Sequence, residues 1–406
     1  MLECIIDAQR HTAQNLADLT LTKKKNCTEW NVIEKVVSVT AGNANNMQAA
    51  IPLLKWKQVP CFAHTLNLIV QAGLTEIKAI QIKVKTIVEL FQRSILASER
   101  LTAMQKQLGE KQIKVKQDVI TWWNSTFDMF ERILEIKRSV ISTIATDYPN
   151  TPNLTPDDTE ILSKCCDLLR HFKSVTEIMS AEKHVTVSQI ILLANLFEKN
   201  CEAFTTQDIP QTVKKMAKRF VTDTSVRFRN VEDNKLFAVS TLLDPRFKAY
   251  GFPDDKKVVD NAKKKYLSNI AAKSIASINE TESAISENIT QSDKNIQKPS
   301  IWDEFDLKIV DAVKKQNPTA AAIIEVDKYF DEPLISRKSH DPVLWWYTKR
   351  HTYPRLYDVV KKHFCTPATS TPSERVFSKA GHVVTDRRNR LDGKKVRMIL
   401  FLHANM

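Results

Sequence analysis

Glycine is scarce in this sequence. Only 6 of its 406 residues are glycine, whereas an average protein contains about 7%. No two of the six lie close enough together to form a glycine-rich phosphate-binding loop. Tight hairpin turns also need residues with positive φ, which glycine supplies most readily. The shortage therefore excludes a collagen-like chain, a β-helix and such a loop, and it disfavours an all-β fold.

Long apolar runs and C-x-x-C cysteine pairs are missing as well. No stretch of 18 or more apolar residues is present, and a membrane-spanning helix needs about that length. Residues 1–4 do not resemble the charged start of a secretory signal. None of the 7 cysteines forms a C-x-x-C pair, so we expect no standard zinc module. These absences predict a protein of a reducing compartment without a membrane segment.

Acidic residues are outnumbered by basic ones. The chain has 60 Lys and Arg against 47 Asp and Glu, which gives a formal net charge of +13 and a pI near 9.3. A charge of this sign suits contact with nucleic acid or another polyanion. Lysines that merely solvate helix surfaces would give the same composition. With 43% hydrophobic residues, the chain otherwise has the composition of a globular protein.

The first 75 residues alternate between strand-like and helix-like patterns. Short apolar or β-branched runs predict strands over residues 4–6, 36–40 and 59–62. Each is followed by a helix-like segment, over residues 12–17, 43–51 and 63–74. Because parallel strands need crossover connections, this alternation predicts parallel strands with covering helices.

The remainder of the chain has mostly helical patterns. Apolar residues recur at helical spacing over residues 76–268, which predicts a large all-α portion. Residues 269–300 are rich in Ser, Thr and Asn and contain no aromatic residue, which predicts a flexible linker. Helical patterning returns over residues 301–406, where Asp341 and Thr371 are expected to begin helices.

Three segments carry a family resemblance. Cys61–Leu68 reads C-F-A-H-T-L-N-L, Trp122–Thr126 reads W-W-N-S-T, and Ser373–Ser378 reads S-E-R-V-F-S. In this order the three resemble the C-x-x-H-x-L-N-L, R-W-N-S-T and C-terminal elements of hAT-superfamily transposases. The whole chain is similar to transposase-derived BED-type zinc-finger proteins, although no BED finger is recognisable in it.

The resemblance implies a fold that the patterns alone do not. It implies an incomplete RNase H-like core over residues 1–75, interrupted by a helical insertion over 76–268. After the linker, residues 301–406 would complete the core with a helical segment. Within it, about 325–406 would form the hAT C-terminal dimerisation region. The expected fold class is thus α/β plus a large all-α portion.

The resemblance also identifies a catalytic position that this chain has lost. Active relatives cut DNA with two divalent metal ions held by three carboxylates, which clamp the attacking and leaving oxygens. The second carboxylate position is occupied by Gly42, and the third by Glu374. The first would precede residue 1, and Asp7, the nearest carboxylate, matches no motif. Glu374 also fits position N3 of a capping box begun by Thr371, which is the interpretation we prefer.

Two further motif positions have both a functional and a packing interpretation. Cys61 and His64 have the spacing of metal ligands, but no second pair accompanies them, so we expect a buried core position rather than zinc. The resemblance implies that Trp123 contacts DNA, whereas its apolar stripe with Phe127 indicates a core residue. The arginine expected before it is replaced by Trp122, which removes a phosphate-binding group.

Two surfaces of the last 66 residues suggest partners. Arg387, Arg388 and Arg390 form the best candidate for DNA-phosphate contact or nuclear localisation. The dimer interface that the resemblance implies is expected to use apolar residues of this segment, because aromatic-rich apolar surfaces are typical of interface cores. These residues are Trp345, Trp346, Val396, Ile399 and Leu400.

We therefore expect a catalytically inactive, transposase-derived nuclear protein that forms a homodimer or higher homo-oligomer and contacts DNA without sequence specificity. It should need no cofactor or metal, and no membrane or small-molecule substrate is expected. Two alternatives stay open. The chain could be an active metal-dependent transposase or nuclease, or a helical protein-interaction scaffold without DNA binding.

Overall fold

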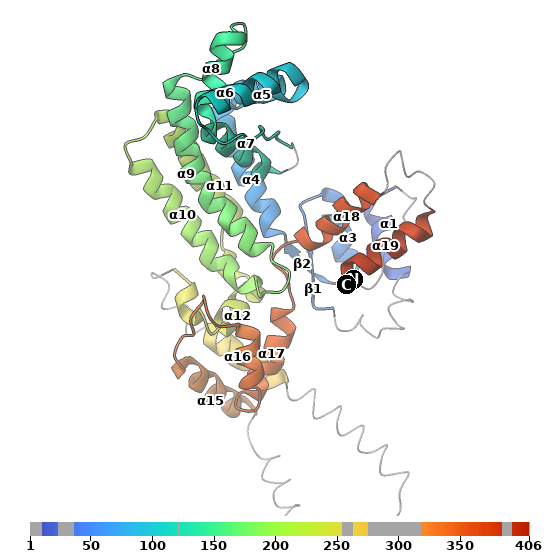
Figure 1. Ribbon diagram of the computed structural model, residues 1–406. Helices are drawn as coiled ribbons and strands as arrows, with labels where there is room; N and C mark the ends of the chain where they lie inside the picture. The colour runs from blue at the N-terminus through green and yellow to red at the C-terminus, as the bar shows by residue number, and fades with distance from the viewer. Residues whose placement is uncertain are drawn as a thin grey trace, which may run out of the picture. The chain divides into compact units, whose positions relative to one another are not determined.

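The computed structural model describes residues 10–22, 36–119, 122–253, 263–274, 318–383 and 392–405 (Figure 1). The chain divides into two compact units. Unit 1 comprises Met1–Glu182, Leu193–Arg229 and Ala368–Met406, and unit 2 comprises Lys183–Leu192 and Asn230–Pro367. In the described part of the chain, no helix combines the length and the apolar character that a bilayer crossing requires.

A small parallel sheet lies in unit 1. Strand β1 (Ser38–Ala41) pairs with β2 (Lys57–Pro60) in parallel, with Thr40 opposite Val59. Helix α3 (Asn45–Leu53) connects the strands and contacts α1 (Ala13–Thr22). The parallel pairing confirms the expectation from the alternating pattern. The strand expected over residues 4–6 lies outside the described residues.

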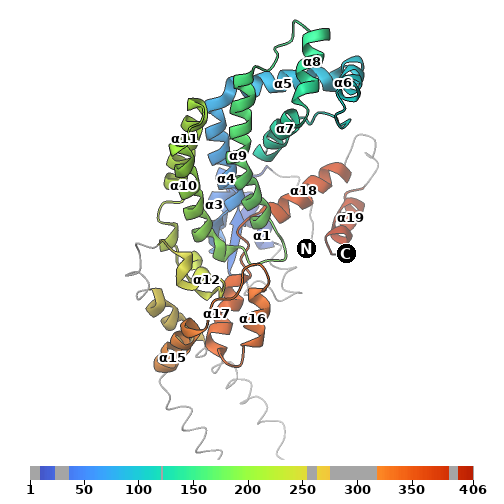
Figure 2. The same cartoon turned by 60° about the vertical axis from the view of Figure 1, so that its left-hand side comes forward.

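Helices make up the rest of unit 1, in agreement with the helical pattern. The core is built around three long helices that lie side by side in Figures 1 and 2, namely α4 (Phe62–Leu74), α9 (Pro156–Met179) and α11 (Gln211–Arg227). The other helices are α5 (Lys78–Arg93), α6 (Ile95–Gln107), α7 (Trp123–Glu135), α8 (Lys137–Asp147), α10 (Ile190–Thr206), α18 (Thr371–Val383) and α19 (Gly393–Asn405), with the short η2 (Thr75–Ile77).

Aromatic packing and one glycine bring these helices together. The ring of Phe172 on α9 lies 4.7 Å from that of Phe197 and 4.8 Å from that of Phe220, centroid to centroid. On α4, a Cβ added at Gly73 would come within 2.0 Å of the Phe220 ring. Only glycine therefore lets α4 approach α11 this closely, because the buried phenyl ring has no space to withdraw.

Unit 2 is a smaller helical body. Its helices are α12 (Lys235–Leu243), an unlabelled helix over residues 263–274, α15 (Pro318–Asp331), α16 (Pro342–Thr348) and α17 (Pro354–Phe364), with short turns η3 (Val187–Gln189), η4 (Val231–Asp233) and η5 (Lys248–Gly251). As expected, Asp341 caps α16, accepting from the backbone N–H of Val343. The helix over 263–274 extends six residues into the expected linker, whose other residues, 275–300, lie outside the described ones.

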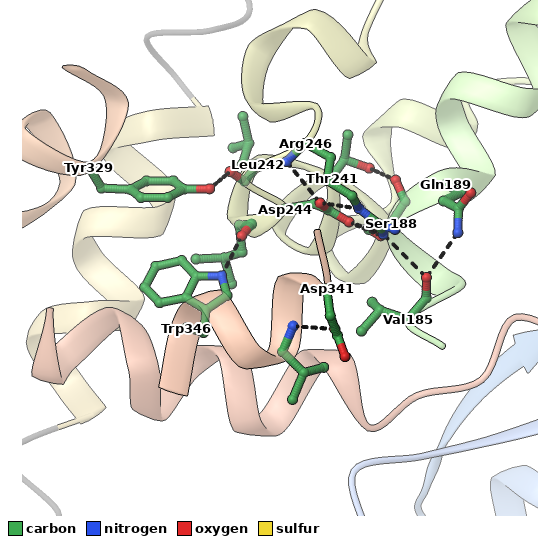
Figure 3. Close-up of polar contacts among 12 residues, drawn as sticks. Val185, Ser188, Gln189, Thr241, Leu242, Asp244, Arg246, Tyr329, Asp341 and Trp346 are labelled. Carbon is green, nitrogen blue, oxygen red and sulfur yellow. Dashed lines mark hydrogen bonds and ion pairs between the residues drawn. The ribbon is translucent and has the colours of Figure 1, made fainter. Parts of the chain in front are cut away.

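Two aromatic side chains donate hydrogen bonds to the last carbonyl groups of α12 (Figure 3). Trp346 Nε1 donates to the Leu243 carbonyl at 2.8 Å, and the Tyr329 hydroxyl donates to the Leu242 carbonyl at 3.0 Å. The last carbonyls of a helix have no partner within the helix, so these bonds satisfy groups that burial would otherwise leave unpaired. Trp346 is 0% exposed, and its side chain therefore belongs to the intramolecular core, which corrects the expectation that it forms part of the dimer surface.

A buried ion pair follows directly after α12. Asp244 is fully buried and accepts hydrogen bonds from Arg246 Nε at 2.8 Å and Arg246 Nη2 at 2.6 Å (Figure 3). The Ser188 hydroxyl donates to the same carboxylate at 2.6 Å. Nearby, Lys248 donates to the carbonyl oxygens of Tyr329 and Glu332, and burial lowers the pKa of Lys248 to about 8. Charged hydrogen bonds thus fasten η3 and the segment after α15 to the turn that follows α12.

Candidate functional site at the carboxyl ends of two parallel strands

Gly42 lies at the carboxyl end of β1, where open α/β sheets place their sites. An added Cβ at this position would lie 3.8 Å from Nδ1 of His64 on α4. A side chain at position 42 would therefore face an imidazole ring. The residue that stands there offers neither a carboxylate nor any other ligand atom.

Cys61 joins the strand ends to the C-terminal segment. Its backbone N–H donates to the Ala41 carbonyl at 2.9 Å, and its thiol sulfur accepts from the backbone N–H of Ser370 at 3.2 Å. The next residue, Phe62, donates its N–H to the Ala368 carbonyl at 2.9 Å. Cys61 is buried and already serves as a hydrogen-bond acceptor, which fits the expected core role better than a ligand role.

Glu374 lies on the first turn of α18, directly after this junction. Its carboxylate accepts a hydrogen bond from the Ser370 hydroxyl at 2.8 Å. Helix α18 begins at Thr371, so Ser370 occupies the cap position one residue before the one we expected. The Thr371 hydroxyl instead contacts the Ser180 hydroxyl at 3.3 Å. Glu374 is thus held locally at the helix start, although through a different partner from the expected Thr371 backbone N–H.

The donor set at the strand ends is poor in metal ligands. Among the described residues, no group of three or more His, Cys, Asp or Glu side chains is arranged to hold a metal ion. Asp7, the nearest carboxylate to the first catalytic position, lies outside the described residues. What the geometry gathers is one carboxylate, one imidazole and a thiol already engaged as an acceptor. Three convergent carboxylates, as a two-metal site requires, are not brought together by the residues described here.

Trp123 is a core residue in this structure. It is fully buried, and its ring packs edge-on against Phe127 and Phe172 with centroid separations of 6.4 Å in both cases. Its backbone N–H donates to Oδ1 of Asn67 at 3.1 Å, which ties α7 to α4. A side chain without exposed surface cannot contact DNA in this conformation, so the packing interpretation fits the geometry and the DNA-contact interpretation does not.

The two C-terminal surfaces differ in what can be described. Arg387, Arg388 and Arg390 lie outside the described residues. Of the expected dimer residues in α19, Val396 and Leu400 are buried within their own chain, whereas Ile399 is 41% exposed and stays available for an interface. Trp345 is half-buried and stacks on Tyr353. Burial of Val396 and Leu400 removes their side chains from any further interface.

Further exposed apolar residues lie in the same region, and no motif in the sequence pointed to them. On α19, Met398 is 65% and Leu402 is 50% exposed, and Phe377 on α18 is also exposed. Met398 and Leu402 lie one turn apart on the side opposite Val396 and Leu400. A helix with apolar residues on opposite sides is normally covered on both, and this pattern in residues 396–402 was the available signal.

Comparison with known proteins gives two matching family models. The hAT family C-terminal dimerisation region matches residues 325–406, and the ZBED1 RNase-like helical domain matches residues 59–168. Neither model is a BED finger.

Three curated relatives are similar over most of the chain. Zinc finger BED domain-containing protein 4 of Homo sapiens is 24% identical, over 86% of this chain and 29% of that protein. The putative AC transposase of Zea mays is 26% identical, over 96% of this chain and 51% of that protein. Zinc finger BED domain-containing protein 6 of Homo sapiens is 26% identical, over 91% of this chain and 40% of that protein. The chain therefore spans about half or less of the length of these relatives.

Proposed function

This chain is a hAT-family protein with a C-terminal dimerisation region, related to BED-type zinc-finger proteins and AC transposases, and we propose that it is a transposase-derived nuclear protein that self-associates without cutting DNA. The observation that carries the proposal is the site at Gly42. There the family's carboxylate position holds no ligand atom and faces His64 instead.

The sheet supports a partial RNase H-like core as the architecture of this proposal. Its two parallel strands and the crossover helix α3 form one unit of such a core. The backbone contacts of Cys61 and Phe62 place the start of α18, with Glu374, beside the carboxyl ends of these strands. This proximity supports the proposal that Glu374 is a remnant of the third carboxylate position, whereas Gly42 offers no ligand atom at the second.

Catalytic inactivity has a direct consequence in a DNA-nicking assay. With Mg²⁺ or Mn²⁺, the unmodified chain should leave supercoiled plasmid intact. Gly42→Asp should also fail to nick it. Two carboxylates do not satisfy a two-metal site, and Mg²⁺ releases its waters reluctantly unless several ligands are well placed. Glu374→Ala is the matched control, because it removes the remaining family carboxylate without adding a group. If the unmodified chain nicks DNA and Glu374→Ala abolishes the activity, the alternative of an active nuclease is correct.

Contact with DNA is the second part of the proposal, supported by the net charge of +13. Replacing Arg387, Arg388 and Arg390 with Ala should weaken binding to unrelated duplexes equally. The plot of log binding constant against log salt concentration should also become shallower. Its slope should change by up to about one unit for each phosphate that the variant no longer neutralises.

A charge-matched variant gives the control for this binding experiment. Lys57, Lys106 and Lys111 are exposed in unit 1, so replacing them with Ala removes the same three charges elsewhere. Fluorescence anisotropy at several salt concentrations measures both variants. Equal effects of the two triple substitutions would assign DNA contact to net charge rather than to the arginine cluster. Absence of any salt-dependent binding would favour the scaffold alternative.

A further inference from the structure

Unit 1 contains a polar pocket of about 150 Å³ away from the strand ends. It is formed by the end of α4, by η2 and α5, by the extended segment before residue 120 and by the start of α7. A water molecule occupies about 30 Å³ in the liquid. The pocket therefore has room for one small hydrated group rather than for a drug-sized molecule.

The charges of the pocket leave one lysine uncommitted. The Asp118 carboxylate forms an ion pair with Lys85 Nζ at 2.6 Å and accepts a hydrogen bond from the Thr126 hydroxyl at 3.2 Å. Its negative charge is therefore already paired. Lys78 also lines the pocket, and within the described part of the chain its ammonium group has no hydrogen-bonding or ion-pair partner. With two lysines and one carboxylate, the lining carries a net positive charge. It therefore favours an anion over a cation.

Gln81 is the second hydrogen-bond donor in the wall. Its residue is 7% exposed, and its amide makes no hydrogen bond to any residue that the structure describes. The amide atoms are not among the fully enclosed polar atoms, so they are open to the pocket, where water or a ligand can bond to them. Lys78, Gln81 and Lys85 lie at i, i+3 and i+7 of α5, so all three project from one face of that helix.

We propose that this pocket binds a phosphate group. A phosphate offers several acceptor oxygens, which match the free ammonium of Lys78 and the amide N–H groups of Gln81. The single carboxylate in the wall is engaged by Lys85 and does not repel the anion strongly. The proposal goes beyond the proposed function, because neither self-association nor catalytic inactivity requires this pocket. The phosphate is either free in solution or part of a nucleic-acid backbone.

Calorimetric titration of the full chain with inorganic phosphate at constant ionic strength tests the site. Phosphate should bind the unmodified chain, and both Lys78→Ala and Gln81→Leu should weaken the affinity by about tenfold or more, as expected for loss of a charged hydrogen bond. Lys106→Ala, an exposed lysine on α6, should bind phosphate as the unmodified chain does. Leucine at position 81 removes the amide at similar volume. Because this amide makes no hydrogen bond to the described residues, the variant should keep its melting temperature in phosphate-free buffer, which separates lost binding from lost folding.

A second titration with a short single-stranded oligonucleotide distinguishes the two phosphate sources. If Gln81→Leu and Lys78→Ala weaken oligonucleotide binding as well, and inorganic phosphate competes with it, the pocket binds a backbone phosphate. If the oligonucleotide binds all variants equally while phosphate does not, the pocket binds free phosphate. The proposal is overturned if phosphate fails to bind at millimolar concentration or binds every variant equally. Binding of uncharged thymidine that Gln81→Leu abolishes would overturn it too.

Discussion

Replacing Met398 and Leu402 with Ser is expected to abolish the proposed self-association and leave a monomer. Both side chains are exposed on the side of α19 that the described residues leave uncovered. In a two-fold dimer each substitution acts twice. The double variant therefore removes four apolar side chains from the interface. At about 1 kcal/mol for each, the free energy of dimerisation should weaken by about 4 kcal/mol, or roughly a thousandfold in dimer affinity. Analytical ultracentrifugation across the micromolar range measures this change.

A matched control separates a specific interface from general apolar stickiness. Ile95 and Leu96 on α6 are also strongly exposed but lie outside the matched dimerisation region, so Ile95→Ser with Leu96→Ser should leave the dimer affinity unchanged. Circular dichroism should show that both double variants keep their helix content. A monomeric unmodified chain at these concentrations would refute the proposed self-association. A dimer that survives Met398→Ser with Leu402→Ser would exclude this face of α19 as the interface.

Asp244→Asn should destabilise unit 2 by about 3–5 kcal/mol, because it leaves a buried arginine without its counter-charge. The Asp244 side chain is 0% exposed and that of Arg246 is 9% exposed, so water cannot replace the lost carboxylate. Asparagine keeps the shape and one acceptor oxygen, which confines the change largely to charge. Hydrogen exchange measured by mass spectrometry should show faster exchange in peptides of α12 than in peptides of α9 in unit 1.

Two comparison variants define this effect. Glu89→Gln breaks the exposed i,i+4 pair with Arg93 on α5 and should cost less than about 1 kcal/mol, because solvent screens that pair. Asp244→Asn combined with Arg246→Met removes both charges. Its loss in free energy of unfolding should be smaller than the sum of the losses of the two single variants. If Asp244→Asn is as mild as Glu89→Gln, the ion pair does not hold unit 2 together.

Local sequence signals predicted the elements of the sheet and the start of α4 well. β-branched residues before Gly42 and the run before Cys61 mark strands because each signal is contained in a few residues. The helix-like segment expected over residues 12–17 also forms, as the first part of α1, and Thr12 caps it by accepting from the backbone N–H of Asn15. By contrast, Ser370 and Thr371 are adjacent and both able to cap a helix. Which of them does so depends on the Ser180 contact, made by a residue 191 positions earlier.

Exposure was harder to predict than secondary structure. Trp345 and Trp346 are neighbours in the sequence, yet within the described residues only Trp346 has a carbonyl partner, at the end of α12, and is fully buried. Gln81 lies on the same helix face as two lysines, so its pattern predicts a solvated side chain. It is buried beside segments that come about 40 residues later. Such contacts between distant segments have no signature in a single sequence.

The hydrogen bond between Cys61 and Ser370 also determines how late in synthesis the fold of unit 1 can be completed. The two residues are 309 positions apart. At a synthesis rate of about 5–20 residues per second, the strand ends would wait roughly 15–60 s for their last partner to emerge from the ribosome. During that interval the nascent chain exposes the backbone donor of Phe62 and the apolar surface that the final segment covers. The first half of unit 1 is therefore expected to depend on chaperones during translation, and a prematurely terminated chain should aggregate.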